Sequence, residues 1–334
     1  MKNQLTAILA ILGFAAVLSG PGYGAPAPSS RDGGSVVVDL GLGLGTLRGN
    51  TLYHISSYNA TGGVESELEF PLETVLIGLE GSYIEKDKKG RERLSLRFHW
   101  FTNVDNGSGV LKDSDWLSGQ PEIDLVGASH PGLDIYSESD ISLKTHIIDV
   151  HASYKFWPSD RWCIGPLAGF LFEKFSFDAS NVSQVGYGPY AGSYTQSTSG
   201  PVLTYEVTYV VPYVGVHAEA RVSRSLRAGI DLGFSPVASA SDEDDHLLRT
   251  KVARGSTTGT AYLVTIAAIW DLRNNDFLQL RGQYVDISTT GTQSQSWYGN
   301  ADAPIAYAGD VITGIDDRIE SRQTSAYLLF SHRF

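Results

Sequence analysis

The sequence LRAGIDLGFS at residues 226–235 decides the fold, because apolar and polar residues alternate along its whole length. Alternation with a period of two is typical of a β-strand that has one apolar and one polar face. The same pattern recurs at 93–101, 147–156 and 210–221, and we therefore predict an all-β protein. The apolar members of the first stretch are Leu226, Ala228, Ile230, Leu232 and Phe234.

Residues 1–24 have the features of a secretory signal peptide. Lys2 precedes an apolar run from Leu5 to Leu18, and Gly22 and Gly24 are the small residues that a cleavage site needs. We expect cleavage after Gly24, followed by a flexible leader at 25–34. An uncleaved membrane anchor is the alternative, but the apolar run is short for one. The mature chain is then expected outside the cytoplasm.

Alternating strands in that compartment can line a membrane barrel, with apolar side chains toward lipid and polar ones toward the lumen. Residues 326–334 alternate up to a terminal Phe334, an ending that resembles the assembly signal of bacterial outer-membrane barrels. Short connections also alternate with long ones, as periplasmic turns and external loops do. The long connections are expected near 56–63, 105–137, 180–200, 241–257 and 291–318.

We count ten strands, an even number as expected for a bacterial single-chain barrel. Several exceed the ~9–11 residues that cross a bilayer. We therefore predict that residues 35–334 form one ten-stranded antiparallel transmembrane β-barrel that extends above the outer membrane. The strands are expected near 35–55, 64–84, 92–104, 138–157, 161–179, 201–221, 225–240, 258–273, 276–290 and 319–334.

Composition excludes some functions. The net charge of −12 disfavours a nucleic-acid partner, which would require a basic surface, but suits a basic partner. Cys163 is the only cysteine, so no internal disulfide can form. No cysteine-based metal spacing and no Gly-x-Ser-x-Gly element are present, and we expect neither a metal nor another cofactor. We expect a monomer.

Two acidic stretches fall in predicted loops. Asp244 and His246, in the sequence SDEDDH at 241–246, are two positions apart and would point the same way if the strand continued. A carboxylate beside an imidazole can orient it as a general base. Asp113 and Asp115 share this spacing and could share a proton and hold a water molecule. The alternative is that these acids are merely solvated, or bind Ca²⁺ loosely.

Short blocks from Gly41 to Phe334 resemble the omptins, ten-stranded outer-membrane proteases of Gram-negative bacteria. The resemblance is concentrated in Leu44–Gly49, Asp113–Trp116, His130–Pro131, Pro212–Gly215 and Ser241–His246. Two acidic blocks in the same order are specific in combination.

The resemblance implies particular roles for these acids. Asp244 and His246 would form a catalytic dyad, and Asp113 and Asp115 the opposing pair that holds the attacking water. Asp242 would lie in the pocket for a basic side chain before the cut. Omptins cleave polypeptides, typically between two basic residues, and their active site faces the cell exterior.

The sequence departs from the family at two places. Tyr53 or His54 stands where the family has a second pocket acid. Omptins also require lipopolysaccharide, bound by basic residues on the outside of the barrel. Lys174 stands at one such position, but Phe172 and Thr208 stand where the family has a Glu and an Arg.

Two other functions fit the same barrel. A non-catalytic adhesin or receptor is suggested by the missing pocket acid. A pore for small solutes is suggested by the charged lumen faces, although ten strands leave little room inside.

Overall fold

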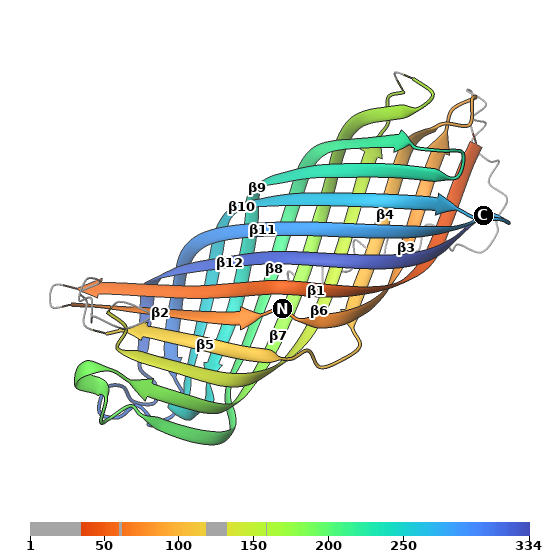
Figure 1. Ribbon diagram of the computed structural model, residues 1–334. Coiled ribbons are helices and arrows are strands. Elements are labelled where there is room, and N and C mark those ends of the chain that lie inside the picture. Colours follow the sequence, from red (N-terminus) through yellow and green to blue (C-terminus); the bar gives the residue numbers. More distant parts are fainter. Residues whose placement is uncertain (1–34, 60–61, 118–131, 158) are drawn as a thin grey trace, which may run out of the picture.

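The computed structural model describes residues 35–59, 62–117, 132–157 and 159–334, which form one antiparallel β-sheet closed into a barrel (Figure 1). The predicted signal peptide and leader at 1–34, and the His130–Pro131 block, lie outside the described residues. No helix in the described ranges is long and apolar enough to cross a membrane.

The sheet contains twelve strand segments, accompanied by two short 3₁₀ helices, η1 (Gly188–Tyr190) and η2 (Leu247–Arg249). The strands are β1 (Ser35–Asn59), β2 (Gly62–Pro71), β3 (Thr74–Lys86), β4 (Glu92–Asn103), β5 (Gly109–Trp116), β6 (Ile135–Tyr154), β7 (Trp162–Gly186), β8 (Gln196–Arg221), β9 (Leu226–His246), β10 (Lys251–Asp271), β11 (Asp276–Trp297) and β12 (Val311–Arg333).

The twelve segments occupy ten strand positions around the barrel, which we call staves. Two of these staves are interrupted, and each therefore consists of two segments. Segments β2 and β3 both pair with β1, one beyond the other, and β5 and β4 both pair with β6. Pro71 ends β2, and it lacks the N–H that would continue the ladder. The predicted ten-stranded antiparallel barrel is therefore confirmed, with two interruptions that the sequence pattern did not reveal.

The barrel closes where β12 pairs with β1, from Asp39 opposite Arg333 to Ser56 opposite Asp316. An apolar belt surrounds the outside near the C-terminal end of the molecule, and its members on β1, β3, β11 and β12 stand opposite one another in the ladders. Such a belt is the lipid-facing surface of a membrane barrel. Its exposed members include Leu40, Leu42, Leu44, Ile77, Leu79, Val214, Val216, Ile230, Leu232, Ile266, Leu280, Leu328 and Phe330.

Beyond the belt the strands continue, and the outward face becomes charged. In Figure 1 this upper barrel is the end that carries β2 and β5, far from the C-terminus. Its outward side chains lie clear of the lipid-facing surface and form ion pairs with each other. They include Lys144, Lys174, Glu206, Glu243, Arg254 and Arg318.

The strand extensions correct two of the predicted loops. Residues 105–137 contain β5 and the start of β6, and residues 241–257 contain the end of β9, η2 and the start of β10. Both acidic blocks therefore lie on strands rather than in loops. Above the belt a strand can be polar on both faces, so the loss of apolar alternation did not mark its end.

Side chains fill the lumen at belt height, and a hollow of about 670 Å³ opens below this filling, beside Glu92, Glu219 and Arg227. The Lys155 ammonium, fully buried, lies 2.6 Å from Glu92 Oε2 and 2.9 Å from Glu219 Oε2. The cavity beside His99 and Asp149 is about 20 Å³, room for about one water molecule. This filling opposes the solute-pore alternative.

We predict that Lys155→Met lowers the free energy of unfolding by about 3–5 kcal/mol, because it leaves two buried carboxylates, Glu92 and Glu219, with Arg227 in place of two shared cations. The matched control is Lys144→Met, which removes an ion pair to Asp178 whose two side chains are 71% and 61% exposed. That change should cost at most about 1 kcal/mol. Chemical unfolding in detergent micelles measures both, and equal losses would contradict the assignment of a buried network.

Candidate active site

Five inward-facing side chains meet in the upper barrel. Strand β5 contributes Asp113 and Asp115, and strand β9 contributes Asp242, Asp244 and His246. On each strand the members are two residues apart, so strand geometry directs them to the same face. The sequence predicted these five residues, and the structure places all of them on the lumen side of the sheet above the belt.

The closest contact in the group joins Asp244 and His246. Asp244 Oδ2 lies 2.7 Å from His246 Nε2, and the Asp244 side chain is 1% exposed. Burial lowers the pKa of His246, while the charge of Asp244 opposes that shift. A neutral imidazole whose Nε2–H donates to Asp244 keeps Nδ1 free of a proton, so it can act as a base.

Asp113 and Asp115 form a second carboxyl pair around Ser66 of β2. Ser66 Oγ lies 3.5 Å from Asp113 Oδ1, and Ser66 stands directly opposite Asp115 in the β2–β5 ladder. Burial raises the pKa of both carboxyl groups, and the charges of Asp115 and Asp244 raise the pKa of Asp113 further. The pair therefore tends to retain a proton, as close carboxylates do.

The two pairs are close enough to influence each other across the lumen. The charge of Asp244 raises the pKa of Asp113, and the charge of His246 lowers that of Asp115. Lys251, which opens β10 and is buried, lies in the same electrostatic environment, and burial lowers its pKa. Lys251 was not predicted as a site residue, because residues 241–257 were expected to form a loop. Together these groups combine a base, a proton-holding carboxyl pair and a cation.

Asp242 occupies a different part of the lumen wall, below the dyad. Its side chain is buried, and neither carboxylate oxygen accepts a hydrogen bond of good geometry. Burial and the charge of Asp317, on β12, raise the pKa of Asp242 to about 8, and the charge of Asp244 adds to this. Asp317 was not predicted as a site residue either. In the structure Ile315, Asp317 and Ile319 lie on the inward face of β12.

The two residues at the expected position of the second acid face opposite ways. Tyr53 points into the lumen, 1% exposed, and its hydroxyl donates to Gln293 Oε1 at 2.8 Å. His54 is partly exposed, and its Nδ1 lies 3.7 Å from Glu67. Strand β1 therefore supplies a tyrosine, and no acid, to this part of the lumen.

The predicted lipid position lies on the outer face of β7 and β8. Lys174 is partly exposed, pairs with Thr208 across the ladder, and places Nζ 2.8 Å from Glu206 Oε1. Phe172 is half-buried and lies one position nearer the belt on the same face, opposite Val210. Lys174, Phe172 and Thr208 thus lie together on the outer face, and Lys174 forms an ion pair with Glu206.

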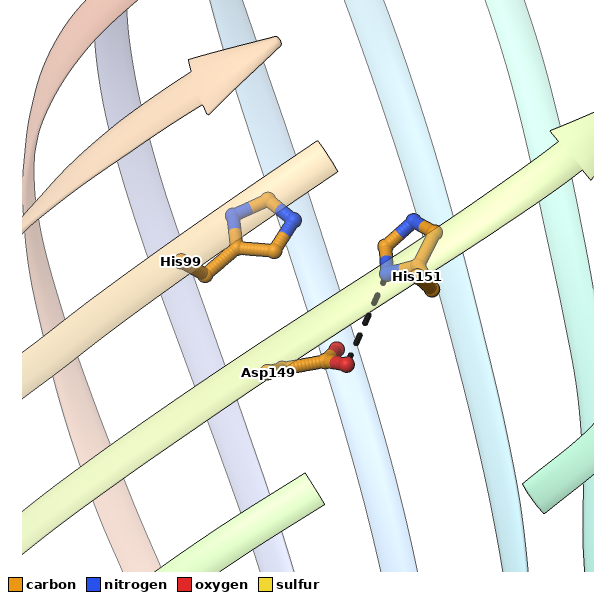
Figure 2. A group of neighbouring side chains, drawn as sticks. All are labelled: His99, Asp149 and His151. Carbon is orange, nitrogen blue, oxygen red and sulfur yellow. Dashed lines mark ion pairs between the residues drawn. The ribbon is translucent and has the colours of Figure 1, made fainter. Parts of the chain in front are cut away.

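Among the described residues, His99, Asp149 and His151 have donor atoms spaced for a metal ion, all within 4.8 Å of one another (Figure 2). His151 Nδ1 lies 3.5 Å from Asp149 Oδ1. His99 Nδ1 already has Arg281 Nη1 at 2.8 Å, and a guanidinium repels a second cation. We therefore interpret this cluster as part of the polar side chains that fill the lumen, and we assign it no catalytic role.

The closed sheet, its apolar belt and the polar site above it define an outer-membrane β-barrel. The model of the Omptin family matches residues 35–315. The chain therefore belongs to the omptin family. Omptins are outer-membrane proteases, and this chain is accordingly an outer-membrane protease that acts on polypeptides.

Two individual proteins illustrate the similarity. The plasminogen activator of Yersinia pestis is 26% identical over 226 residues, which cover 66% of this chain and 67% of the relative. The crystal structure of the outer membrane protease OmpT from Escherichia coli matches with a TM-score of 0.72 at 16% identity, covering 89% of this chain and 97% of OmpT. The second likeness concerns the fold.

We predict that the stability of the barrel falls as pH rises from 5 to 9, and that Asp242→Asn reduces this fall. The raised pKa of Asp242 means that the folded state holds a proton which the unfolded chain releases near pH 4. This contribution is present below the unfolded pKa and is lost as pH rises through about 8.

At pH 9 the Asn variant should be more stable than the parent by about 1–3 kcal/mol, because no unpaired charge is buried. Chemical unfolding in micelles at several pH values measures the slope. Glu243→Gln, an exposed neighbour on the same strand, is the control and should keep the parental slope. A parental slope in the Asp242 variant would contradict the assignment.

Proposed function

We propose that this protease is an endopeptidase that cleaves polypeptides at basic sites, with its active site facing the cell exterior. Asp244 and His246 activate a water molecule, and Asp113 and Asp115 lie opposite them. The observation that carries the proposal is that these two pairs face each other across the lumen, above the lipid-facing belt.

Each group has a chemical task in this proposal. His246 accepts a proton from the water, and Asp244 holds the imidazole and stabilises the imidazolium that forms. The hydroxide attacks the peptide carbonyl, and the proton that Asp113 and Asp115 retain donates a hydrogen bond to the developing oxyanion. The imidazolium then gives its proton to the leaving amine, which breaks the C–N bond and restores the dyad.

The charge of the site supports a basic substrate. Asp242 is a buried carboxyl group without a side-chain partner, a bound guanidinium would favour its charged form, and the whole chain has a net charge of −12. A desolvated arginine side chain needs such a partner. The relative from Yersinia pestis is named a plasminogen activator, which is consistent with a polypeptide substrate.

We propose further that lipopolysaccharide supports the activity and that the protein acts as a monomer. Lys174 is the candidate contact for a lipid phosphate, on the outer face above the belt. Its ion pair with Glu206 must open, or rearrange, for the ammonium to bind a phosphate.

We predict that His246→Ala and Asp244→Asn each lower kcat/KM for a peptide with paired basic residues by about 10²–10⁴-fold, because general base catalysis is lost. Asp113→Asn and Asp115→Asn should each impair the reaction in the same way. The assay uses refolded barrel in detergent with lipopolysaccharide, and mass spectrometry maps the cuts. Asp245→Asn removes a neighbouring carboxylate that accepts a hydrogen bond from Tyr298, and it should keep parental activity.

Circular dichroism establishes that each variant is folded before its activity is compared. If folded His246→Ala cuts as well as the parent, the assignment of the dyad is wrong. If the folded parent cuts no basic peptide, with lipopolysaccharide present, the non-catalytic adhesin or receptor becomes the better account.

We predict that Lys174→Ala raises the concentration of lipopolysaccharide needed for half-maximal activity by about 3–10-fold, as expected for the loss of one charge-assisted contact. Titration of lipopolysaccharide into the cleavage assay measures this value. Lys144→Ala, an outward lysine of the neighbouring β6, is the control. If the parent and the Lys174 variant need the same concentration of lipopolysaccharide, Lys174 does not bind the lipid and serves only in its ion pair with Glu206.

A further inference from the structure

Two carboxyl groups in the upper lumen have no side-chain partner among the described residues. Asp242 is 6% exposed and Asp317 is 3% exposed, yet none of their four oxygens accepts a hydrogen bond of good geometry from the described residues. Within the described part of the chain, neither forms an ion pair with a lysine, arginine or histidine at 4.0 Å or less. Burying unpaired carboxylates is costly, so their persistence here requires an explanation.

The two carboxylates face each other over a glycine. Asp242 is on β9 and Asp317 is on β12, with β10 and β11 between them. Gly255 of β10 lies opposite Asp242 in the ladder. A Cβ atom at Gly255 would lie 2.3 Å from Asp242 Oδ1 and 2.1 Å from Asp317 Oδ2. Asp242 Oδ1 and Asp317 Oδ2 therefore both lie close to the position that a Cβ atom of residue 255 would occupy. Because residue 255 is glycine, no side chain fills the space between the two oxygens.

Aromatic rings and one amide line the same region. The charges of Asp242 and Asp317 both act on the hydroxyl groups of Tyr53 and Tyr205, whose ring centroids are 5.4 Å apart. The Tyr53 hydroxyl already donates to Gln293, and so it does not neutralise either carboxylate. The pocket thus has two acidic acceptors and aromatic faces, and no lysine or arginine of the described residues pairs with either acid.

This combination selects the chemistry of the ligand. A guanidinium is planar, carries five N–H donors, and can bind two carboxylates while it stacks on an aromatic face. An ammonium has three donors and stronger hydration, so it gains less from the two fixed acceptors. The pocket therefore fits an arginine side chain better than a lysine side chain.

We propose that Asp317 is the second acid of the pocket formed with Asp242, and that the two carboxylates together bind the arginine side chain of the substrate residue before the cut. The inference rests on the proposed endopeptidase function. In this role Asp317 replaces the second pocket acid that was expected on β1, because β1 has Tyr53 at that position of the lumen. Ile55 of β1 stands directly opposite Asp317, so the acid comes from the adjoining stave. The family match ends at residue 315, before this position.

The test compares peptides that differ only in the residue before the cut, which is arginine, lysine or citrulline. Citrulline keeps the shape of arginine but lacks its charge. We expect Asp317→Asn to reduce the arginine-to-citrulline ratio of kcat/KM by about 10–100-fold, as expected for a buried charge-assisted pair. Cleavage of the citrulline peptide should persist, which shows that the catalytic groups are intact.

Asp316→Asn is the matched control, because Asp316 carries the same charge one residue away on the exposed face of β12. It should keep the parental ratio. Gly255→Ala provides a second route to the same result, since its Cβ would occupy the space between the carboxylates. If folded Asp317→Asn keeps the parental ratio, the proposal is overturned. If Asp317→Asn does not fold, a parental ratio in folded Gly255→Ala overturns it.

A binding measurement separates this proposal from the proposed function. His246→Ala, and the same variant with Asp317→Asn, are titrated with a fluorescent arginine peptide and its citrulline counterpart. Weaker binding of the arginine peptide after the second change supports the pocket, even if the parent cuts nothing and the protease proposal fails. Equal binding by both barrels overturns the role of Asp317, even if the parent is an active protease.

Discussion

The structure depends on the closure of one sheet upon itself. In a bilayer no water is available to bond an unpaired N–H or C=O group, so a strand with a free edge cannot cross. The ladder between β12 and β1 removes that edge along most of both strands, from the end near the C-terminus far into the upper barrel. Closure also fixes which side chains face inward, because alternate residues on every stave must point to the same lumen.

That alternation serves two environments with one geometry. Near the C-terminal end it directs apolar side chains to lipid and encloses charged groups such as Lys155 with Glu92 and Glu219. Above the belt, both faces contact water or substrate, and the inward face brings together acids from staves that are distant in the sequence. Asp113 of β5 and Asp244 of β9 meet only because the sheet is closed.

Much of this was accessible from the sequence. Period-two alternation gave the barrel and the number of its staves, and the i, i+2 spacing placed Asp113 with Asp115 and Asp244 with His246. The interruption after Pro71 was not predicted, because residues 64–84 were expected to form one strand. The strand that resumes at Gly109 was not predicted, because 105–137 was expected to be a loop. The upper strand ends were mistaken for loops, since polar residues on both faces leave no alternation to detect.

Asp317 shows a different limit. The sequence pattern placed it in the connection at 291–318, but β12 begins at Val311, and Asp317 alternates on its inward face with Ile315 and Ile319. Its relation to Asp242 depends on register across two intervening staves and on the absent side chain of Gly255. Neither quantity can be obtained from one sequence, because register between strands is set by pairing and not by the composition of either strand.

The most direct test of the account is cleavage of a membrane-impermeant peptide by intact bacteria that express the chain. The peptide carries a quenched fluorophore and one arginine site. The account predicts rapid cleavage by intact cells and none by cells with equal surface amounts of Asp244→Asn barrel. Cleavage that appears only after lysis, or that persists in the Asp244 variant, would contradict an outward-facing site built on this dyad.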